Sequence, residues 1–332
     1  MKIGIIGAGS WGTALAILLA GSGKEVFLWD VDEGLLKEIS KTHENKKYLE
    51  GRLLPESIEI AATAEECLRG AEFVVTAVPS QHFRSALSGA LPFMPEGAIV
   101  VNVSKGIELG SLKTLSEIAK ETAPEKRYAV LSGPSHAEEV ANGMPTTVAV
   151  ASSDRKTAEA VQDAFMTERF RIYTQSDVTG VELGGALKNI IALGAGISDG
   201  MGYGDNTKAA LMTRGITEMA RLGRRMGADP ETFYGLSGIG DLIVTCTSGH
   251  SRNRRCGVMI GQGVPVKEAI ARVGMVVEGI PAAEAARGLA KKLGVEMPIT
   301  EAICLIVSGE IPPEEALSAL MTRDKKHEHW KQ

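Results

Sequence analysis

A lysine embedded in a long apolar segment is the side chain of this sequence best suited to proton chemistry. Residues 183–187 and 190–193, on either side of Lys188, are all apolar or glycine. Burial of an ammonium group lowers its pKa toward the range in which it can give up and regain a proton. The alternative is a surface interruption of a buried helix, but a helix this apolar rarely has a solvated face. The pattern therefore favours a desolvated general acid or base.

An aspartate follows a glycine-shaped turn further along the chain. Asp241 comes directly after Leu236-Ser237-Gly238-Ile239-Gly240. A carboxylate in this position can orient a lysine, or it can cap the helix that follows. Both interpretations remain open from the sequence.

A basic cluster, Ser251-Arg252-Asn253-Arg254-Arg255, lies in a chain whose net charge is -5. One interpretation is a solvated face or a contact with nucleic acid. The other is a site for a single phosphate, because a guanidinium group bonds two phosphate oxygens at once.

Polar residues also follow three predicted strands, at the point where each strand ends. Pro79-Ser80 follows Val78, Ser104-Lys105-Gly106 follows Val103, and Ser132 to Glu138 follows Leu131. Each of these segments could consist of residues that serve only to form a turn. In a doubly wound sheet, however, ligands lie beyond the carboxyl ends of the strands. Three such segments at one end of the sheet therefore indicate a binding site.

The first thirty residues provide the scaffold for that site. An apolar strand over 2–6 leads into Gly7-Ala8-Gly9-Ser10-Trp11-Gly12, a helix is predicted over 13–20, and a second strand over 25–29 ends on Asp30. The glycines allow a tight turn, a close approach to a pyrophosphate, and packing of helix on strand. The pyrophosphate is expected on the free N–H groups of the helix start. This context predicts a dinucleotide site rather than a chance G-x-G-x-x-G.

Composition restricts the remaining classes. A chain of 332 residues suits two domains, and its four cysteines, without a C-x-x-C pair, indicate reduced thiols rather than a disulfide framework or a zinc site. The acidic net charge and an aromatic content of 5% argue against a nucleic-acid partner. The glycines interrupt a would-be secretory signal, and no stretch is apolar for the length of a membrane span, so we expect a cytoplasmic protein without membrane insertion. We expect no bound metal.

The order of predicted elements gives the fold class. Strands and helices alternate up to residue 177, which predicts a doubly wound, Rossmann-type parallel sheet with helices on it. Beyond residue 177 the apolar period changes from two to about 3.6, which predicts an all-α domain. We therefore expect a dinucleotide-binding domain over 1–177 and a helical substrate-binding domain over 178–332, with a solvated charged tail from Arg323 to Gln332.

Taken in order, these motifs resemble bacterial NAD(P)-dependent glycerol-3-phosphate dehydrogenase over essentially the whole chain. The matching segments are 7–16, 103–108, 133–135, 187–189, 238–242, 251–253 and 276–279. The resemblance implies interconversion of sn-glycerol 3-phosphate and dihydroxyacetone phosphate with NAD or NADP, for phospholipid synthesis, by a homodimer. The small-molecule partner would be a phosphate ester.

The resemblance also implies roles for individual residues. Lys188 would donate and accept the proton at C2, with Lys105 and Asp241 completing the catalytic set. The substrate would be held by Lys105, Gly133, Ser135, Lys188, Asp241, Ser251, Arg252 and Asn253. The cofactor would be bound by Gly7, Gly9, Ser10, Trp11, Gly12, Asp30, Val31, Lys105, Ala137, Arg252, Val276 and Glu278.

The cofactor type is the point where this chain departs from part of the family. Some members carry a glycine followed by a basic residue where this chain has Asp30-Val31. An acid here bonds the ribose 2′-OH and repels a 2′-phosphate, so the residue type favours NAD, whereas the family commonly uses NADP.

Two other functions compete with this one. A dehydrogenase of the 3-hydroxyacid or 6-phosphogluconate kind also places a lysine on a long helix, but it would need a carboxylate site rather than Ser251-Arg252-Asn253. A cofactor-sensing protein without catalysis could lose Lys188, Lys105 or Asp241 without penalty, yet all three are present.

Overall fold

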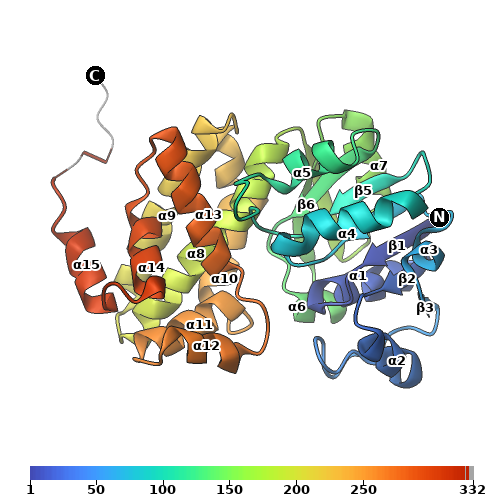
Figure 1. Cartoon of the computed structure of the whole chain (residues 1–332), viewed down its shortest axis with the longest axis horizontal. Helices are drawn as coiled ribbons and strands as arrows, with labels where there is room; N and C mark the ends of the chain where they lie inside the picture. Colours follow the sequence, from blue (N-terminus) through green and yellow to red (C-terminus); the bar gives the residue numbers. More distant parts are fainter. Residues whose placement is uncertain (326, 329–332) are drawn as a thin grey trace.

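The computed structural model describes residues 1–325 and 327–328, and in Figure 1 it divides into a sheet-containing half and a helical half. All strands precede residue 176, and every later element of the described chain is helical. The predicted fold class, a Rossmann-type domain followed by an all-α domain, is confirmed.

One sheet forms the centre of the first half. Its strands are β1 (Lys2–Ile6), β2 (Glu25–Trp29), β3 (Ile58–Ile60), β4 (Phe73–Thr76), β5 (Ile99–Asn102), β6 (Arg127–Ser132), β7 (Thr146–Ala151) and β8 (Phe170–Gln175). Their order in the sheet is β3-β2-β1-β4-β5-β6-β7-β8. The chain winds outward from β1 to β3 and then returns to place β4 on the other side of β1. This reversal is where a doubly wound sheet binds its ligand.

All neighbouring strands are parallel except β6 and β7, which are antiparallel. This pair departs from the wholly parallel sheet that the sequence suggested. The helix between them, α6 (Ala137–Ala141), has only five residues. At about 1.5 Å per residue it is too short to carry the chain back along a strand that rises about 3.3 Å per residue.

Helices cover both faces of the sheet. They are α1 (Ser10–Gly21), α2 (Glu33–Thr42), α3 (Ala64–Leu68), α4 (Phe83–Ala90), α5 (Leu115–Thr122), α6 and α7 (Arg155–Phe165). Within β4, Phe73 and Val75 belong to one apolar core while Val74 belongs to the core on the opposite face. Both faces are buried, which explains why this strand is continuously apolar rather than alternating.

The second half is built around one long helix, α8. The α-helices of this half are α8 (Val178–Gly200), α9 (Asp205–Arg225), α10 (Asp241–Thr247), α11 (Arg252–Gly261), α12 (Val266–Val273), α13 (Gly279–Leu293), α14 (Pro298–Ser308) and α15 (Pro313–Met321). By length and composition α8 could cross a membrane, but its most apolar stretch is entirely buried inside the protein. It is the core helix of this half, with its neighbours around it in Figure 1.

Glycines bring α11 unusually close to α8. A Cβ at Gly196 would lie 2.1 Å from the carbonyl oxygen of Arg254, and one at Gly257 would lie 2.2 Å from that of Leu193. No side chain larger than hydrogen fits at either position. This close packing fixes the first residues of α11 relative to α8.

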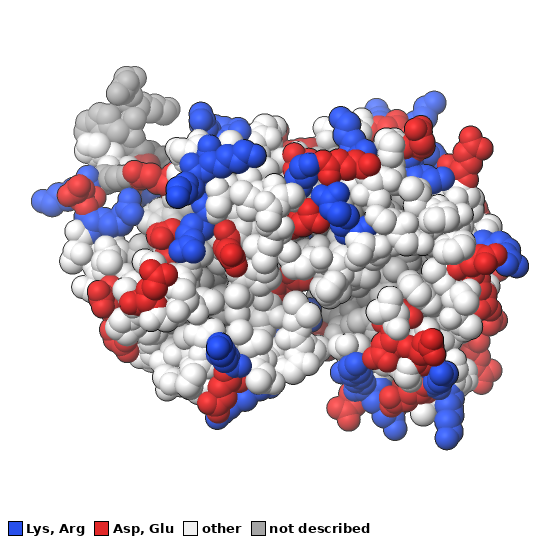
Figure 2. Space-filling model, viewed as in Figure 1, with Lys and Arg blue, Asp and Glu red and all other residues white. Residues whose placement is uncertain are grey.

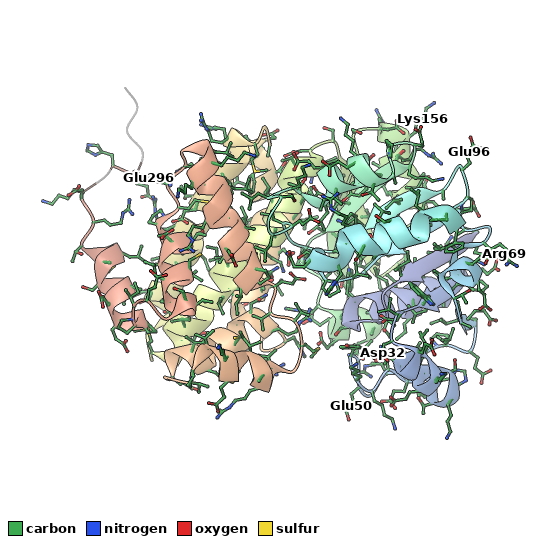
Figure 3. All side chains as sticks on the ribbon, in the orientation of Figure 1. Asp32, Glu50, Arg69, Glu96, Lys156 and Glu296 are labelled. Carbon is green, nitrogen blue, oxygen red and sulfur yellow. The ribbon has the colours of Figure 1, made fainter. Side chains whose placement is uncertain are left out.

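Charged side chains cover the outer surface. Lysine and arginine are interspersed with aspartate and glutamate over the face in Figure 2, and the hollow between the two halves is bordered mostly by uncharged residues. In Figure 3 the exposed side chains of Arg69, Glu96 and Lys156 project outward from the sheet half. This face carries no broad field of one sign, such as non-specific nucleic-acid binding requires.

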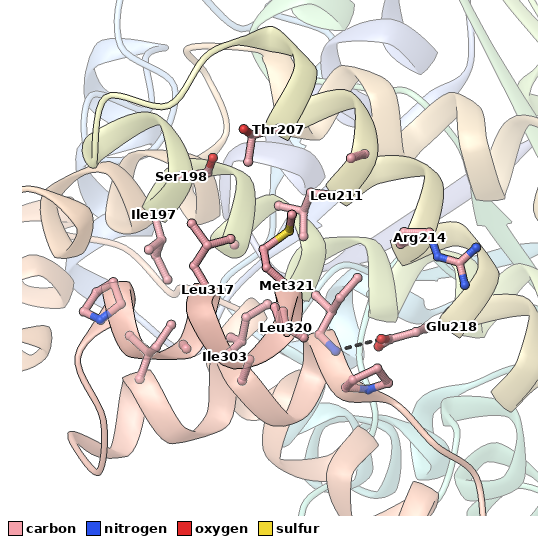
Figure 4. Close-up of a pocket in the computed structure, with 18 of the residues that line it drawn as sticks. Ile197, Ser198, Thr207, Leu211, Arg214, Glu218, Ile303, Leu317, Leu320 and Met321 are labelled. Carbon is pink, nitrogen blue, oxygen red and sulfur yellow. Dashed lines mark hydrogen bonds between the residues drawn. The ribbon is translucent and has the colours of Figure 1, made fainter. Parts of the chain in front are cut away.

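An apolar cavity of about 300 Å³ lies in the helical half (Figure 4). Leu211, Ile303 and Leu317 line its middle, and Glu218 at one side accepts a hydrogen bond from the Ile299 N–H. None of the residues predicted to act in catalysis or binding lines this cavity. The predicted chemistry therefore belongs to a different place in the fold.

Candidate active site

Two lysines meet one buried carboxylate at the junction of the two halves. The Lys188 ammonium donates to Oδ1 of Asp241 at 2.7 Å, and the Lys105 ammonium donates to Oδ2 at 2.7 Å. Lys188 and Asp241 are 6% and 1% exposed. The structure thus brings together all three residues predicted for catalysis.

Each member of this group comes from a separate element. Lys188 lies midway along α8, Asp241 is the first residue of α10, and Lys105 follows β5. Asp241 follows the short π-helical segment Leu236–Gly240, which packs tightly on α8, because a Cβ at Gly184 would lie 2.4 Å from the carbonyl oxygen of Ser237. The sequence left open whether Asp241 orients a lysine or caps a helix, and its carboxylate contacts two lysines.

The electrostatics of the group suit proton transfer by Lys188. Burial, together with the Lys105 ammonium, lowers the pKa of Lys188 to about 8, although Asp241 acts in the opposite direction. Burial opposes ionisation of Asp241, but the two ammonium groups outweigh it and hold the pKa of that carboxyl below its usual value. Lys188 therefore titrates near neutral pH beside a carboxylate that stays charged.

Thr245 belongs to the same cluster, although it was not among the predicted residues. Its hydroxyl accepts from the Lys188 ammonium at 2.7 Å and donates to the backbone carbonyl of Asp241 at 2.6 Å. It follows Asp241 by one helical turn in α10, so the i, i+4 spacing was the available signal. With Asp241 it fixes the position of the ammonium.

A guanidinium group without a partner lies at the start of α11. Among residues 1–325 and 327–328 the Arg252 side chain makes no hydrogen bond or ion pair. Burial lowers the pKa of this side chain, although the charge of Glu278 acts to raise it, and a guanidinium group this basic stays charged. A partly buried cation with free donors is a suitable site for an anion.

The neighbours of Arg252 are committed to structural contacts. Ser251 caps α11 by accepting from the Arg254 N–H at 3.2 Å. Asn253 donates to the side chain of Asn189 at 2.9 Å and accepts from the Gly279 N–H at 2.8 Å. The Ser251 hydroxyl hydrogen and the second amide N–H of Asn253 are left for a ligand.

The segment after β6 reaches the same group. The Gly133 carbonyl accepts from the Lys105 ammonium at 3.1 Å, and the hydroxyl of Ser135 donates to this carbonyl at 2.9 Å. Gly133 has φ +151 and a Cβ there would lie 2.9 Å from Cα of Val148, so only glycine fits. This segment joins the lysines to the sheet.

A cavity of about 1010 Å³ runs from this group along the carboxyl ends of β1, β2, β4 and β5. Of the predicted residues, it is lined by Gly7, Gly9, Ser10, Trp11, Asp30, Val31, Lys105, Ser135, Arg252, Asn253, Val276 and Glu278. The remaining predicted residues, Gly12, Gly133, Ala137, Lys188, Asp241 and Ser251, lie outside that lining. One continuous cavity thus joins the glycine motif to Lys105 and Arg252.

The glycine motif fits a dinucleotide. A Cβ at Gly12 would lie 1.9 Å from the carbonyl oxygen of Gly7, whereas a Cβ at Gly9 would meet nothing within 4 Å. Gly12 therefore serves packing, and Gly9 leaves open space beside the first turn of α1. That open cradle at a helix N-terminus is the geometry that receives a pyrophosphate.

The other predicted cofactor residues lie around this cradle. Both carboxylate oxygens of Asp30 accept backbone N–H groups, from Ala8 at 2.7 Å and from Asp32 at 3.0 Å. Val31 is 83% exposed, and Ala137 is buried at the start of α6. Asp30 thus fixes the glycine loop while remaining in the cavity wall.

Together these features suit reduction of a carbonyl compound that carries an anionic group. The ammonium of Lys188 can stabilise and protonate an oxyanion, and Arg252 can hold the anion. The cavity offers a dinucleotide site next to both. The described residues contain no group of three or more His, Cys, Asp or Glu side chains that could hold a metal ion.

Comparisons with known proteins agree with this arrangement. The family models for the N-terminal and C-terminal parts of NAD-dependent glycerol-3-phosphate dehydrogenase match residues 2–158 and 177–318. A protein of Pelotomaculum thermopropionicum, named glycerol-3-phosphate dehydrogenase (NAD(P)+), is 55% identical over 98% of this chain and 95% of its own length. A Bacillus velezensis protein of the same name is 52% identical over 98% and 96%.

A solved structure is also similar over nearly the whole chain. The crystal structure of glycerol-3-phosphate dehydrogenase from Coxiella burnetii has a TM-score of 0.94 and 38% identity, and covers 97% of this chain and 99% of its own.

Proposed function

The chain belongs to the NAD-dependent glycerol-3-phosphate dehydrogenase family, and we propose that Lys188 is the acid and base of its reaction. That reaction interconverts sn-glycerol 3-phosphate and dihydroxyacetone phosphate with NAD or NADP. The observation that carries the proposal is the buried Lys188 ammonium, whose partner Asp241 also binds Lys105 in the wall of the cavity of about 1010 Å³. Family membership excludes the 3-hydroxyacid and 6-phosphogluconate alternatives.

Lys188 acts on the C2 oxygen of the ketone. When bound, the nicotinamide supplies a hydride to C2, and the electron pair of the carbonyl π bond moves to oxygen. The Lys188 ammonium stabilises the developing negative charge and then transfers its proton to that oxygen. In the reverse direction the neutral amine accepts the hydroxyl proton.

Asp241, Thr245 and Lys105 hold Lys188 ready for this step. Asp241 and Thr245 accept two of its three N–H bonds at 2.7 Å each, which leaves one N–H for the substrate. The charge of Lys105 holds down the pKa of Lys188, so the ammonium gives up its proton more readily.

Arg252 anchors the far end of the substrate. Its unpartnered guanidinium fits a phosphate bidentately, and the binding energy of that remote group orients the carbonyl for reaction. The side chains of Lys105, Ser135, Ser251 and Asn253 supply the remaining substrate contacts.

An assay of wild-type protein tests the function directly. Dihydroxyacetone phosphate added to protein and reduced cofactor should consume the near-ultraviolet absorbance of the cofactor. Pyruvate and 6-phosphogluconate with the matching cofactor form should give no signal. Absence of turnover with dihydroxyacetone phosphate, in the presence of bound cofactor, would support a sensing protein instead.

The pH dependence should show Lys188 titrating. Because the ammonium form reduces the ketone, kcat/KM for dihydroxyacetone phosphate should fall as pH rises through the Lys188 pKa of about 8. For oxidation of glycerol 3-phosphate the neutral amine is needed, so kcat/KM should rise through the same pH. Steady-state rates from pH 6.5 to about 10 measure both. If kcat/KM changed in the same direction with pH for both reactions, one residue would not serve as the acid of one reaction and the base of the other.

The cofactor preference follows from Asp30. Its carboxylate lies in the wall of the cavity, and the basic residues lining the described cavity are His82, Lys105 and Arg252, of which the last two belong to the reacting end. The 2′-phosphate of NADP would lie near this carboxylate and be repelled by it. The neighbouring residue, Val31, is uncharged and cannot offset that repulsion. We expect kcat/KM for NADH to exceed that for NADPH roughly tenfold or more. A preference for NADPH would show that Asp30 does not select the cofactor.

The roles of the two domains and the oligomeric state are also proposals. We propose that residues 1–177 bind the cofactor and that residues 178–332 supply Lys188, Asp241 and Arg252. We further propose a cytoplasmic homodimer, which the family resemblance supports.

A further inference from the structure

A serine and a glutamine in the segment after β4 lie at the junction of three segments that meet near the active site. Ser80 and Gln81 begin the short helical turn Ser80–His82, after the end of β4. The sequence placed Ser80 in a segment that indicates a binding site but gave it no individual role, and it did not single out Gln81. Their side chains nevertheless make hydrogen bonds to the segment after β5 and to the helical half.

The Gln81 side chain forms hydrogen bonds with the backbone that follows Lys105. Its Nε2 donates to the carbonyl of Ile107 at 2.8 Å, and its Oε1 accepts from the N–H of Leu109 at 2.9 Å. The two bonds use both ends of the amide and fix the backbone two and four residues after Lys105. Ile107 is 1% exposed and packs in the core of the helical half. The segment is therefore held by hydrogen bonds on one side and by packing on the other.

Ser80 connects the same place to the helical half. Its N–H and hydroxyl donate to the carboxylate of Glu278 at 3.1 and 2.8 Å. Gly106, next to Lys105, packs directly on Ser80, because a Cβ there would lie 2.2 Å from the Ser80 hydroxyl oxygen. Gln81 also donates to that hydroxyl oxygen at 3.2 Å. The contacts of Ser80 and Gln81 thus form one cluster behind Lys105.

We infer that Gln81, supported by Ser80, is a positioning residue that holds Lys105 against Asp241 and thereby sets the chemistry of Lys188. On its path to Asp241 the stem of Lys105 packs on Gly185 of α8, where a Cβ would lie 3.3 Å from the Lys105 Cγ. A shift of the backbone at Ile107 moves the start of that path. The inference rests on the proposed role of Lys188.

The consequence is measurable because Lys105 acts on Lys188 through its charge. The charged and titratable groups facing Lys188 are Asp241 and Cys246 of α10, Lys105, and His136 after β6. Of these, Lys105 is the cation that disfavours a second positive charge and competes for Asp241. Moving Lys105 away removes this repulsion and leaves Asp241 to Lys188 alone. Both changes raise the pKa of Lys188.

The test is Gln81→Met, which keeps the length of the side chain and removes all three of its hydrogen bonds. We expect kcat for dihydroxyacetone phosphate to fall on the order of tenfold or more, because a small displacement at a reacting centre is costly. The falling limb of the pH profile should also move to higher pH than in wild type. Binding of NADH, followed by fluorescence, should change little.

The matched control is Gln162→Met. Gln162 is equally half-buried, and its Nε2 donates to the carbonyl of Ile172 at 2.8 Å in the same half of the protein, away from the site. This variant should keep both the rate and the pH profile of wild type. Where Gln81→Met folds poorly, Gln81→Glu keeps the acceptor for the Leu109 N–H and loses the donor to Ile107. It should show the same direction of shift.

A merely structural role predicts a different result. In that case Gln81→Met lowers the melting temperature as Gln162→Met does, and leaves kcat and the pH midpoint of the folded protein unchanged, which would overturn the inference. Failure of the proposed function is distinguishable. In that case the rate of the wild-type protein would not fall with rising pH near the Lys188 pKa, and Lys188→Met would remain active.

Discussion

Replacing Lys188 with methionine should lower kcat for reduction of dihydroxyacetone phosphate by roughly 10² or more, the usual effect of losing an acid catalyst. Methionine fills a similar volume but supplies neither the charge that stabilises the C2 oxyanion nor the proton that completes the reaction. The cofactor cavity is formed by other residues, so the Kd for NADH should stay close to that of wild type. Single-turnover rates and cofactor fluorescence measure the two quantities separately.

Lys208→Met provides the control for this variant. Lys208 is also largely buried and ion-paired, with Asp199 at 2.8 Å, but it lies in α9 outside the site. It should retain nearly wild-type kcat. If Lys188→Met turned over at a rate close to wild type, Lys188 would be removed from the mechanism.

Replacing Arg252 with alanine should raise KM for dihydroxyacetone phosphate roughly 10- to 100-fold, with a smaller change in kcat. Charged hydrogen bonds of this kind are worth about 1.5–3 kcal/mol, and no other residue of the described site offers an unpaired guanidinium. Arg252→Lys should recover part of the loss, because it restores the charge without the planar pair of donors.

Two comparisons isolate the phosphate. Arg255→Ala removes an exposed guanidinium of the same cluster and should leave KM unchanged. Dihydroxyacetone, which lacks the phosphate, should be reduced equally slowly by wild type and by Arg252→Ala. An unchanged KM for dihydroxyacetone phosphate in Arg252→Ala would exclude the anchor.

Much of the sheet half could be predicted because its signals are local. Continuous apolar strands, glycines at a strand-to-helix turn and an acid ending the next strand each reflect the conformation of a few residues. The direction of β7 is not local in this sense. Its apolar composition is the same for either direction, and the short α6 before it decides between them.

Two helices that carry the site gave no periodic signal. The face of α11 that packs on α8 consists of glycines such as Gly257 and Gly261, so close packing replaces the apolar stripe. The seven residues of α10 are too few to show a period. The sequence therefore set no bounds for either helix, although the type and setting of Asp241 and Arg252 had already singled them out as candidate site residues.

The contacts of the site are the part that the residues alone could not show. Lys105 and Asp241 are 136 positions apart, and Ser80 and Glu278 are 198 apart. Lys188 could be selected from its apolar flanks, but its pairing with Asp241 depends on how a glycine-rich turn packs on α8. Thr245 and Gln81 become significant only once that packing is known.

The most direct test of the account is a crystal structure of the dead-end complex with oxidised cofactor and dihydroxyacetone phosphate, in which no hydride is available to react. The account predicts the ketone oxygen within hydrogen-bond reach of the Lys188 ammonium, about 2.6–3.2 Å, and the phosphate on the guanidinium of Arg252. A ketone oxygen bound by another donor, with Lys188 out of reach and still paired only with Asp241 and Thr245, would contradict it.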